Sequence, residues 1–180
     1  MVGATDADEA TGGVADDSGD AAVPPPALGT AHDAQLAVQL AEAYTELGEL
    51  ALAERAYLVA LPALEDVHGC TDGAVLDVWA QLQALRMTMG QHERAAADGQ
   101  HVLNMLTLTC GAGSAELIPA AERLAKAHVL ARRWPAARNA LGVAHAIASS
   151  RFGAEQRDTL RIADVLKSLE RYAPPRGSTA

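Results

Sequence analysis

The chain has 180 residues, of which 49% are hydrophobic and only 3% aromatic, enough for one compact domain or a short array of helical repeats. Its net charge of −9 is unevenly placed, since residues 1–85 hold fifteen acids and one base, and residues 86–180 hold eight acids and thirteen bases. No long basic stripe is free of acids, which argues against nucleic-acid binding, while the asymmetry suits solubility, steering of a partner or head-to-tail alignment of copies.

The low cysteine content fits a reducing compartment, and the hydropathy pattern argues against secretion and against a membrane-spanning helix. Cys70 and Cys110 are far apart, so they form neither a disulfide framework nor a closely spaced zinc site. The N-terminus lacks the basic and apolar regions of a secretory signal, and no apolar run reaches the roughly 18 residues of a membrane helix. We therefore expect a cytoplasmic protein, or one of the cytoskeleton or cilium, with no membrane partner.

The two ends of the chain differ in composition from its middle. The segment 1–29 holds six acids, no base and three consecutive prolines, too little apolar surface to offset chain entropy. We expect a disordered acidic tail over 1–29, a helical domain over 30–173 and a disordered tail over 174–180.

The middle of the chain has helical periodicity and no strand pattern. Ser114 is expected to cap one helix and Pro135 to open the next. Pro62 should bend its helix, and Pro119 should delay or bend another. The predicted helices cover 31–47, 50–67, 74–89, 91–109, 115–131, 135–151 and 154–172.

The helices repeat with a fixed shift of 42 residues, which is the distance in sequence from Leu40 to Leu82. A fixed period of this size is typical of a helical repeat array. Small residues at matching positions would let paired helices approach closely, while leucines fill the space between them. The first helix carries Leu36, Leu40, Ala43 and Leu47 on one face, and we expect this face to join the core. The matching series are Leu40, Leu82, Leu124 and Leu166; Ala53, Ala95 and Ala137; Gly48 and Gly90; and Gly69, Gly111 and Gly153.

The repeats resemble tetratricopeptide repeats over about residues 33–172. The signature residues are Ala37, Leu40, Ala41, Tyr44, Ala53, Tyr57 and Ala60 in the first repeat; Trp79, Leu82 and Ala95 in the second; and Leu124, Ala125, Ala137, Leu141 and Ala144 in the third. Gly99 departs from the pattern, which usually has an aromatic residue there. The 42-residue period is similar to the kinesin-light-chain class. The resemblance implies an all-α fold: a right-handed superhelical solenoid of antiparallel helix pairs, with three repeats and a C-terminal capping helix.

The resemblance also implies a concave face, lined by the first helix of each pair, that binds a peptide or a partner helix. A chaperone-type clamp for a C-terminal carboxylate does not fit, because Val38, Glu42, Ala80 and Ala84 replace its Lys and Asn residues. The middle of the face could instead receive a helix, a hydrophobic peptide or the chain's own N-terminal tail. The implied partner-binding residues are Gln35, Val38, Glu42, Thr45, Asp77, Ala80, Ala84, Met87, Glu122, Lys126, Val129 and Arg161.

The sequence offers no catalytic, metal-binding or cofactor-binding motif. The six histidines show no H-x3-H pair, and no nucleophile elbow, P-loop or dinucleotide fingerprint is present. Similar repeats form the C-terminal part of SET-and-MYND methyltransferases, but this chain has neither the cysteines of a MYND finger nor a SET segment. We therefore expect no enzyme, no cofactor and no metal. The expected function is a non-enzymatic adaptor or scaffold for a protein or peptide partner; the alternative is a fixed subunit of a cytoskeletal, motor or ciliary assembly.

Overall fold

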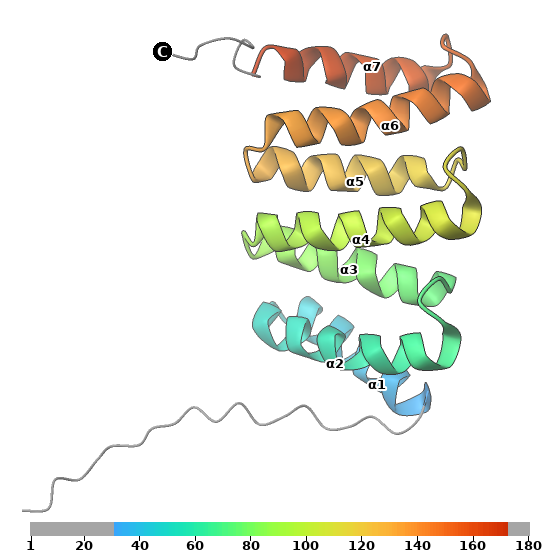
Figure 1. Ribbon diagram of the computed structural model, residues 1–180. Helices are drawn as coiled ribbons and strands as arrows, with labels where there is room; N and C mark the ends of the chain where they lie inside the picture. Colours follow the sequence, from blue (N-terminus) through green and yellow to red (C-terminus); the bar gives the residue numbers. More distant parts are fainter. Residues whose placement is uncertain (1–30, 173–180) are drawn as a thin grey trace, which may run out of the picture.

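The computed structural model describes residues 31–172, which form seven α-helices and no strand (Figure 1). Each helix lies within three residues of its expected bounds, because turn glycines and helical periodicity marked them well. The tails expected over 1–29 and 174–180 lie outside the described residues. The helices are α1 (Ala31–Glu46), α2 (Leu50–His68), α3 (Gly73–Thr88), α4 (His92–Cys110), α5 (Leu117–Leu130), α6 (Trp134–Phe152) and α7 (Arg157–Glu170).

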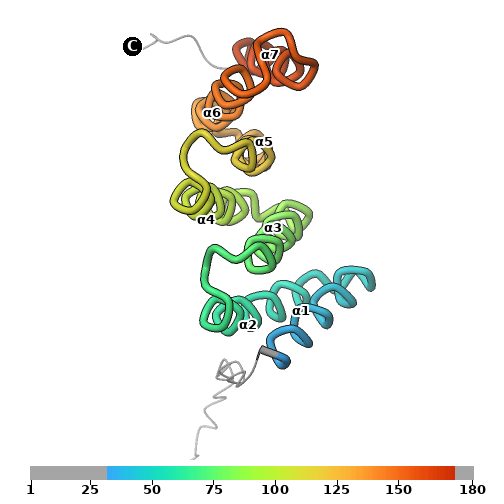
Figure 2. Tube along the Cα trace, turned by 90° about the vertical axis from the view of Figure 1, so that its right-hand side faces the viewer, coloured from blue at the N-terminus to red at the C-terminus, as the bar shows by residue number. Residues whose placement is uncertain are grey.

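The helices stack as pairs α1–α2, α3–α4 and α5–α6, followed by α7. Each helix packs mainly against the helix before it and the helix after it. Figure 2 shows the consequence, with α1, α3, α5 and α7 on one side of the stack and α2, α4 and α6 on the other. The expected all-α solenoid of helix pairs is confirmed.

A left-handed residue closes the turn inside each pair. Gly48 and Gly90 have φ angles of 80° and 77°, and the third repeat places Arg132 there with a φ of 57°. In all three turns the next backbone N–H reaches back across the helix end: Glu49 N to Tyr44 O at 2.9 Å, Gln91 N to Arg86 O at 2.9 Å, and Arg133 N to His128 O at 2.8 Å. Arg132 thus adopts a conformation that suits glycine.

Replacing Arg132 with glycine is expected to raise the free energy of unfolding by about 0.5–1 kcal/mol, because glycine avoids the steric cost of the left-handed backbone. Part of the gain is lost to the greater entropy of glycine in the unfolded chain. Urea unfolding followed by circular dichroism measures the difference. Arg132→Ala is the control: it removes the charge but keeps Cβ, so it should bring no comparable gain.

The start of α5 corrects one sequence expectation. Ser114 does not cap the helix; Glu116 precedes its first residue, and the Ser114 hydroxyl only accepts a bond from Glu116 N at 3.4 Å. The helix begins at Leu117, which places Pro119 in the first turn, where a missing backbone N–H leaves no helical bond unmade. The expected delay at Pro119 is therefore observed. Pro62 lies inside α2, which continues through it.

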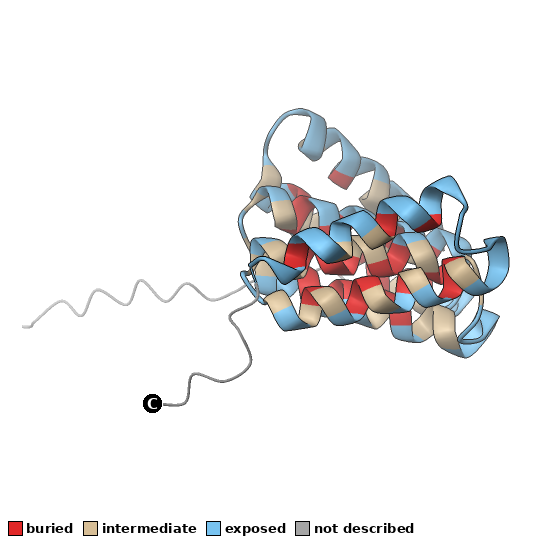
Figure 3. Cartoon of the chain, turned by 90° about the horizontal axis from the view of Figure 1, so that it is seen from above, coloured by how far each residue is buried: buried red, intermediate tan, exposed pale blue. Residues whose placement is uncertain are grey.

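The core forms two clusters between the two layers, where buried residues gather in Figure 3. One cluster joins buried residues of α1, α2 and α3, and the other joins α4, α5, α6 and α7. In the first cluster Val78, Leu82 and Leu85 of α3 pack with the preceding pair. The leucine series of the repeat therefore seals one pair against the next.

The same geometry overturns the expectation for α1. Leu36, Leu40 and Leu47 remain 49%, 49% and 75% exposed. Leu40 belongs to the leucine series and Leu36 matches the buried Val78, but no described helix precedes α1 to cover them. The buried residues of α1 are instead Ala34 and Ala41, which join the cluster that contains α2.

Candidate interaction surface

The twelve expected binding residues all lie on α1, α3, α5 and α7, whose outward side we call the first-helix face. The stack is bowed in Figure 2, and these helices lie on its inner side. None of the twelve is buried, so all of them present some surface to a partner. Seven are exposed (Gln35, Glu42, Thr45, Asp77, Ala84, Lys126 and Arg161), and five are half-buried (Val38, Ala80, Met87, Glu122 and Val129).

Two side-chain contacts join neighbouring first helices. Gln81 Nε2 on α3 donates to Glu42 Oε1 on α1 at 3.3 Å. Arg161 Nη2 on α7 donates to Glu122 Oε1 on α5 at 2.7 Å. These bonds tie α1 to α3 and α5 to α7 along the first-helix face.

A buried tyrosine connects this face to the core. Tyr57 of α2 packs in the first cluster, and its hydroxyl donates to Gln81 Oε1 at 2.9 Å. Burial raises the pKa of Tyr57; a hydrogen bond with Thr45 opposes this rise, and the charge of Glu42 adds to it. Tyr57 is therefore a neutral donor that fixes Gln81 beside Glu42. Sequence reasoning missed Gln81, although it directly precedes Leu82 of the leucine series.

Charge changes along the first-helix face. Glu42 and Asp77 lie on the first two helices, and Lys126 and Arg161 lie on the last two. The exposed Ala84 and half-buried Ala80 come between them on α3. The face therefore offers carboxylates at one end, a small apolar region, and at the other end Lys126 beside the Arg161–Glu122 ion pair.

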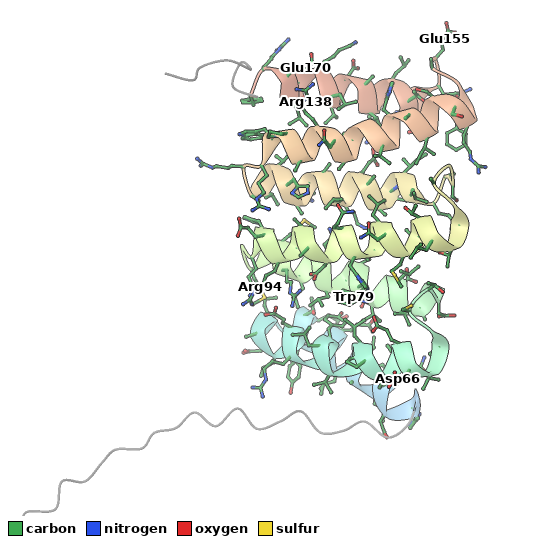
Figure 4. The ribbon with its side chains drawn as sticks, viewed as in Figure 1. Asp66, Trp79, Arg94, Arg138, Glu155 and Glu170 are labelled. Carbon is green, nitrogen blue, oxygen red and sulfur yellow. The ribbon has the colours of Figure 1, made fainter. Side chains whose placement is uncertain are left out.

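Two of the helical histidines, His101 and His128, are half-buried. His101 lies against the Trp79 ring at 4.8 Å between centroids, and Trp79 also donates through Nε1 to Glu65 at 2.9 Å (Figure 4 marks Trp79). Burial and then the charge of Arg133 lower the pKa of His128, so this half-buried ring is neutral at pH 7. Among residues 31–172, no group of three or more His, Cys, Asp or Glu side chains is arranged to hold a metal ion.

The two cysteines lie at or just beyond the ends of second helices. Both Cys70 and Cys110 are exposed. The Cys110 thiol donates to Glu116 Oε2 at 2.8 Å, and this bond raises the pKa of the thiol. A raised pKa reduces the thiolate fraction on which cysteine reactivity depends.

Within the described part of the chain, no helix combines the length and the apolar character needed to cross a membrane.

No family model and no curated protein match the chain. Among solved structures, it is similar to the crystal structure of BtubC (BKLC) from P. vanneervenii, with a TM-score of 0.64 and 17% sequence identity. The match covers 77% of this chain and 56% of BtubC, so this chain spans little more than half the length of that protein. At this identity the likeness shows the fold alone, a tetratricopeptide-like helical array.

Proposed function

We propose that this protein is a non-enzymatic adaptor that binds a peptide or a helix of a partner protein on its first-helix face. The observation that carries the proposal is a face built from four helices on the inner side of the bowed stack, with α1 joined to α3 by the Gln81–Glu42 bond and α5 joined to α7 by the Arg161–Glu122 bond. We also infer that its repeats are of the kinesin-light-chain class. The support is the 42-residue spacing of Gly69, Gly111 and Gly153, each with a positive φ at the end of a second helix.

The charge order on the face suggests the chemistry of the ligand. Basic residues at one end of a peptide would lie over Glu42 and Asp77, and acidic residues at the other end would lie over Lys126. Small apolar side chains would fit over Ala84 between them. Charge complementarity of this kind fixes the direction in which a peptide binds.

Peptides selected on the full chain from a displayed random library are expected to carry Lys or Arg toward one end. The double change Glu42→Lys with Asp77→Lys should weaken their binding by about tenfold or more, because it places like charges together. Fluorescence anisotropy with labelled peptides measures the affinity.

Asp66→Lys is the matched control, since it reverses an exposed carboxylate on α2, in the other layer (Figure 4 marks Asp66). It should leave the affinity unchanged. Equal losses from both substitutions would mean that net charge alone governs binding. Binding unaffected by the double change would place the site elsewhere and refute the proposal.

A further inference from the structure

The α1 end of the stack carries an uncovered apolar face. Leu36, Leu40, Ala43 and Leu47 are here called the α1 stripe: the first three share one side of α1 at intervals of four and three residues, and Leu47 directly follows the end of the helix. All four are exposed. Few isolated proteins leave such a continuous leucine stripe in water without a use for it.

The other repeats show what covers this kind of face. The repeat shift maps the α1 stripe onto residues of α3, α5 and α7 that pack against the preceding second helix: α2 on α3, α4 on α5, and α6 on α7. The α1 stripe is therefore the same interface without its helix. The buried equivalents are Val78, Leu82 and Leu85 in α3; Ala120, Leu124 and Ala127 in α5; and Ile162 and Leu169 in α7.

The opposite end of the stack, formed by α7, has charged residues where α1 has apolar ones. No described second helix follows α7, and Asp164 and Lys167 stand on it where α1 has Val38 and Ala41 facing α2. These two charges lie 3.6 Å apart and are well exposed. At these two positions the α7 end carries charged groups, beside an exposed Leu160, whereas the α1 end keeps a run of leucines.

Charge narrows the choice of occupant for the α1 stripe. Residues 31–85 hold nine acids and one base, and Glu46 directly borders the stripe. A second copy docked through the same end would bring two acidic surfaces together, and one docked head to tail would place the charged Asp164 and Lys167 of its α7 against the leucines. The segment 1–30 also suits the stripe poorly, because it holds six acids and no base.

We propose that the α1 stripe docks an amphipathic helix of a partner protein, one that has basic residues along one edge and takes the place of a preceding second helix. Its apolar residues would follow the spacing of the buried residues Ala53, Tyr57, Ala60 and Leu64 in α2, which is i, i+4, i+7 and i+11. Its Lys or Arg residues would face Glu46. This surface is separate from the first-helix face, and the inference does not depend on the function proposed above.

Two designed helical peptides, each as long as α2, test the proposal on the full chain. Both carry leucines at the α2 spacing; one has Lys at its polar edges and the other has Glu. The Lys peptide is expected to bind at least about tenfold more tightly than the Glu peptide, and added salt should weaken it. Leu40→Glu and, independently, Leu47→Glu should each lower its affinity by about tenfold or more. Leu108→Glu, at an exposed leucine of α4, is the matched control and should change nothing.

Several results would overturn the proposal. These are no binding of the Lys peptide, equal binding of both peptides, or binding that Leu40→Glu and Leu47→Glu leave intact while circular dichroism shows folded variants. If the Lys peptide does not bind, sedimentation identifies the real occupant. A dimer that Leu40→Glu dissociates would mean a second copy, and a monomer would point to the chain's own segment 1–30. Peptides selected for the first-helix face should bind the Leu47→Glu variant normally, which separates the two proposals.

Discussion

Replacing Leu82 with alanine is expected to lower the free energy of unfolding by about 3–5 kcal/mol, whereas the same change at Leu40 should cost less than about 1 kcal/mol. The two leucines occupy the same repeat position. Leu82 of α3 is 0% exposed and packs in the cluster that contains α2. Its loss therefore removes buried apolar area and leaves a cavity. Leu40 keeps about half of its surface in water and leaves no enclosed space. Urea unfolding followed by far-UV circular dichroism measures both costs.

Leu124→Ala serves as a second buried reference, because Leu124 holds the same position in the third repeat and is 2% exposed. Its cost should match that of Leu82→Ala more closely than that of Leu40→Ala. Equal costs at Leu40 and Leu82 would show that α1 is covered in solution, and would contradict the packing described here.

Replacing Arg86 with alanine is expected to cost about 3–5 kcal/mol, because it leaves two carboxylates without their partner in a poorly hydrated site. Arg86 Nε lies 2.8 Å from Glu54 Oε1 on α2, and Arg86 Nη1 lies 2.6 Å from Asp98 Oδ1 on α4. Burial by itself lowers the pKa of Arg86, but the bonds with Glu54 and Asp98 outweigh burial and raise it. The ion triad therefore ties the first helix pair to the second. Thermal and urea unfolding measure the loss.

The control for Arg86 is an ion pair of similar length in water. Arg161 lies 2.7 Å from Glu122, but the two side chains are 54% and 26% exposed, so Arg161→Ala should cost below about 1 kcal/mol. Adding Asp98→Ala to Arg86→Ala should recover part of the loss, since it removes one unpaired charge. Similar costs at Arg86 and Arg161 would mean that burial does not strengthen the triad.

The order, type and bounds of the helices could be predicted from the sequence because local features set them. Glycines with a positive φ follow five of the seven described helices, and the repeat shift carries the same pattern from pair to pair. Even the late start of α5 follows from Pro119, a residue that a helix tolerates only in its first turn. The Ser114 cap was wrong, since Ser114 lies three residues before Leu117.

Packing could be predicted only in part, because periodicity identifies an apolar face but not what covers it. For α1 this made the expectation for Leu36, Leu40 and Leu47 wrong. The Arg86 triad was also missed, although Asp98 gives a signal: the other repeats have Ala56 and Ala140 at its position, and a charge at a small packed position needs a partner. At Gly99 the missing aromatic leaves space that the buried Gln83 side chain fills.

For the candidate surface, sequence alone assigned the twelve residues to the right helices but not their contacts. The bond from Tyr57 to Gln81 joins residues 24 positions apart, and the Gln81–Glu42 bond spans 39. Contacts between residues so far apart in sequence depend on how one helix pair is rotated relative to the next, and the repeat pattern does not specify this rotation. That these residues bind a partner stays a prediction.

Because each helix from α1 to α7 packs mainly on its neighbours in sequence, no distant segments within residues 31–172 have to meet before the array can form. Chains with such local contacts belong to the fastest folders, and helical arrays can nucleate at one pair and zip onward from it. During synthesis, the first pair can therefore form while the last helix is still inside the ribosome. The order in which the chain is made is then also an order in which it can fold.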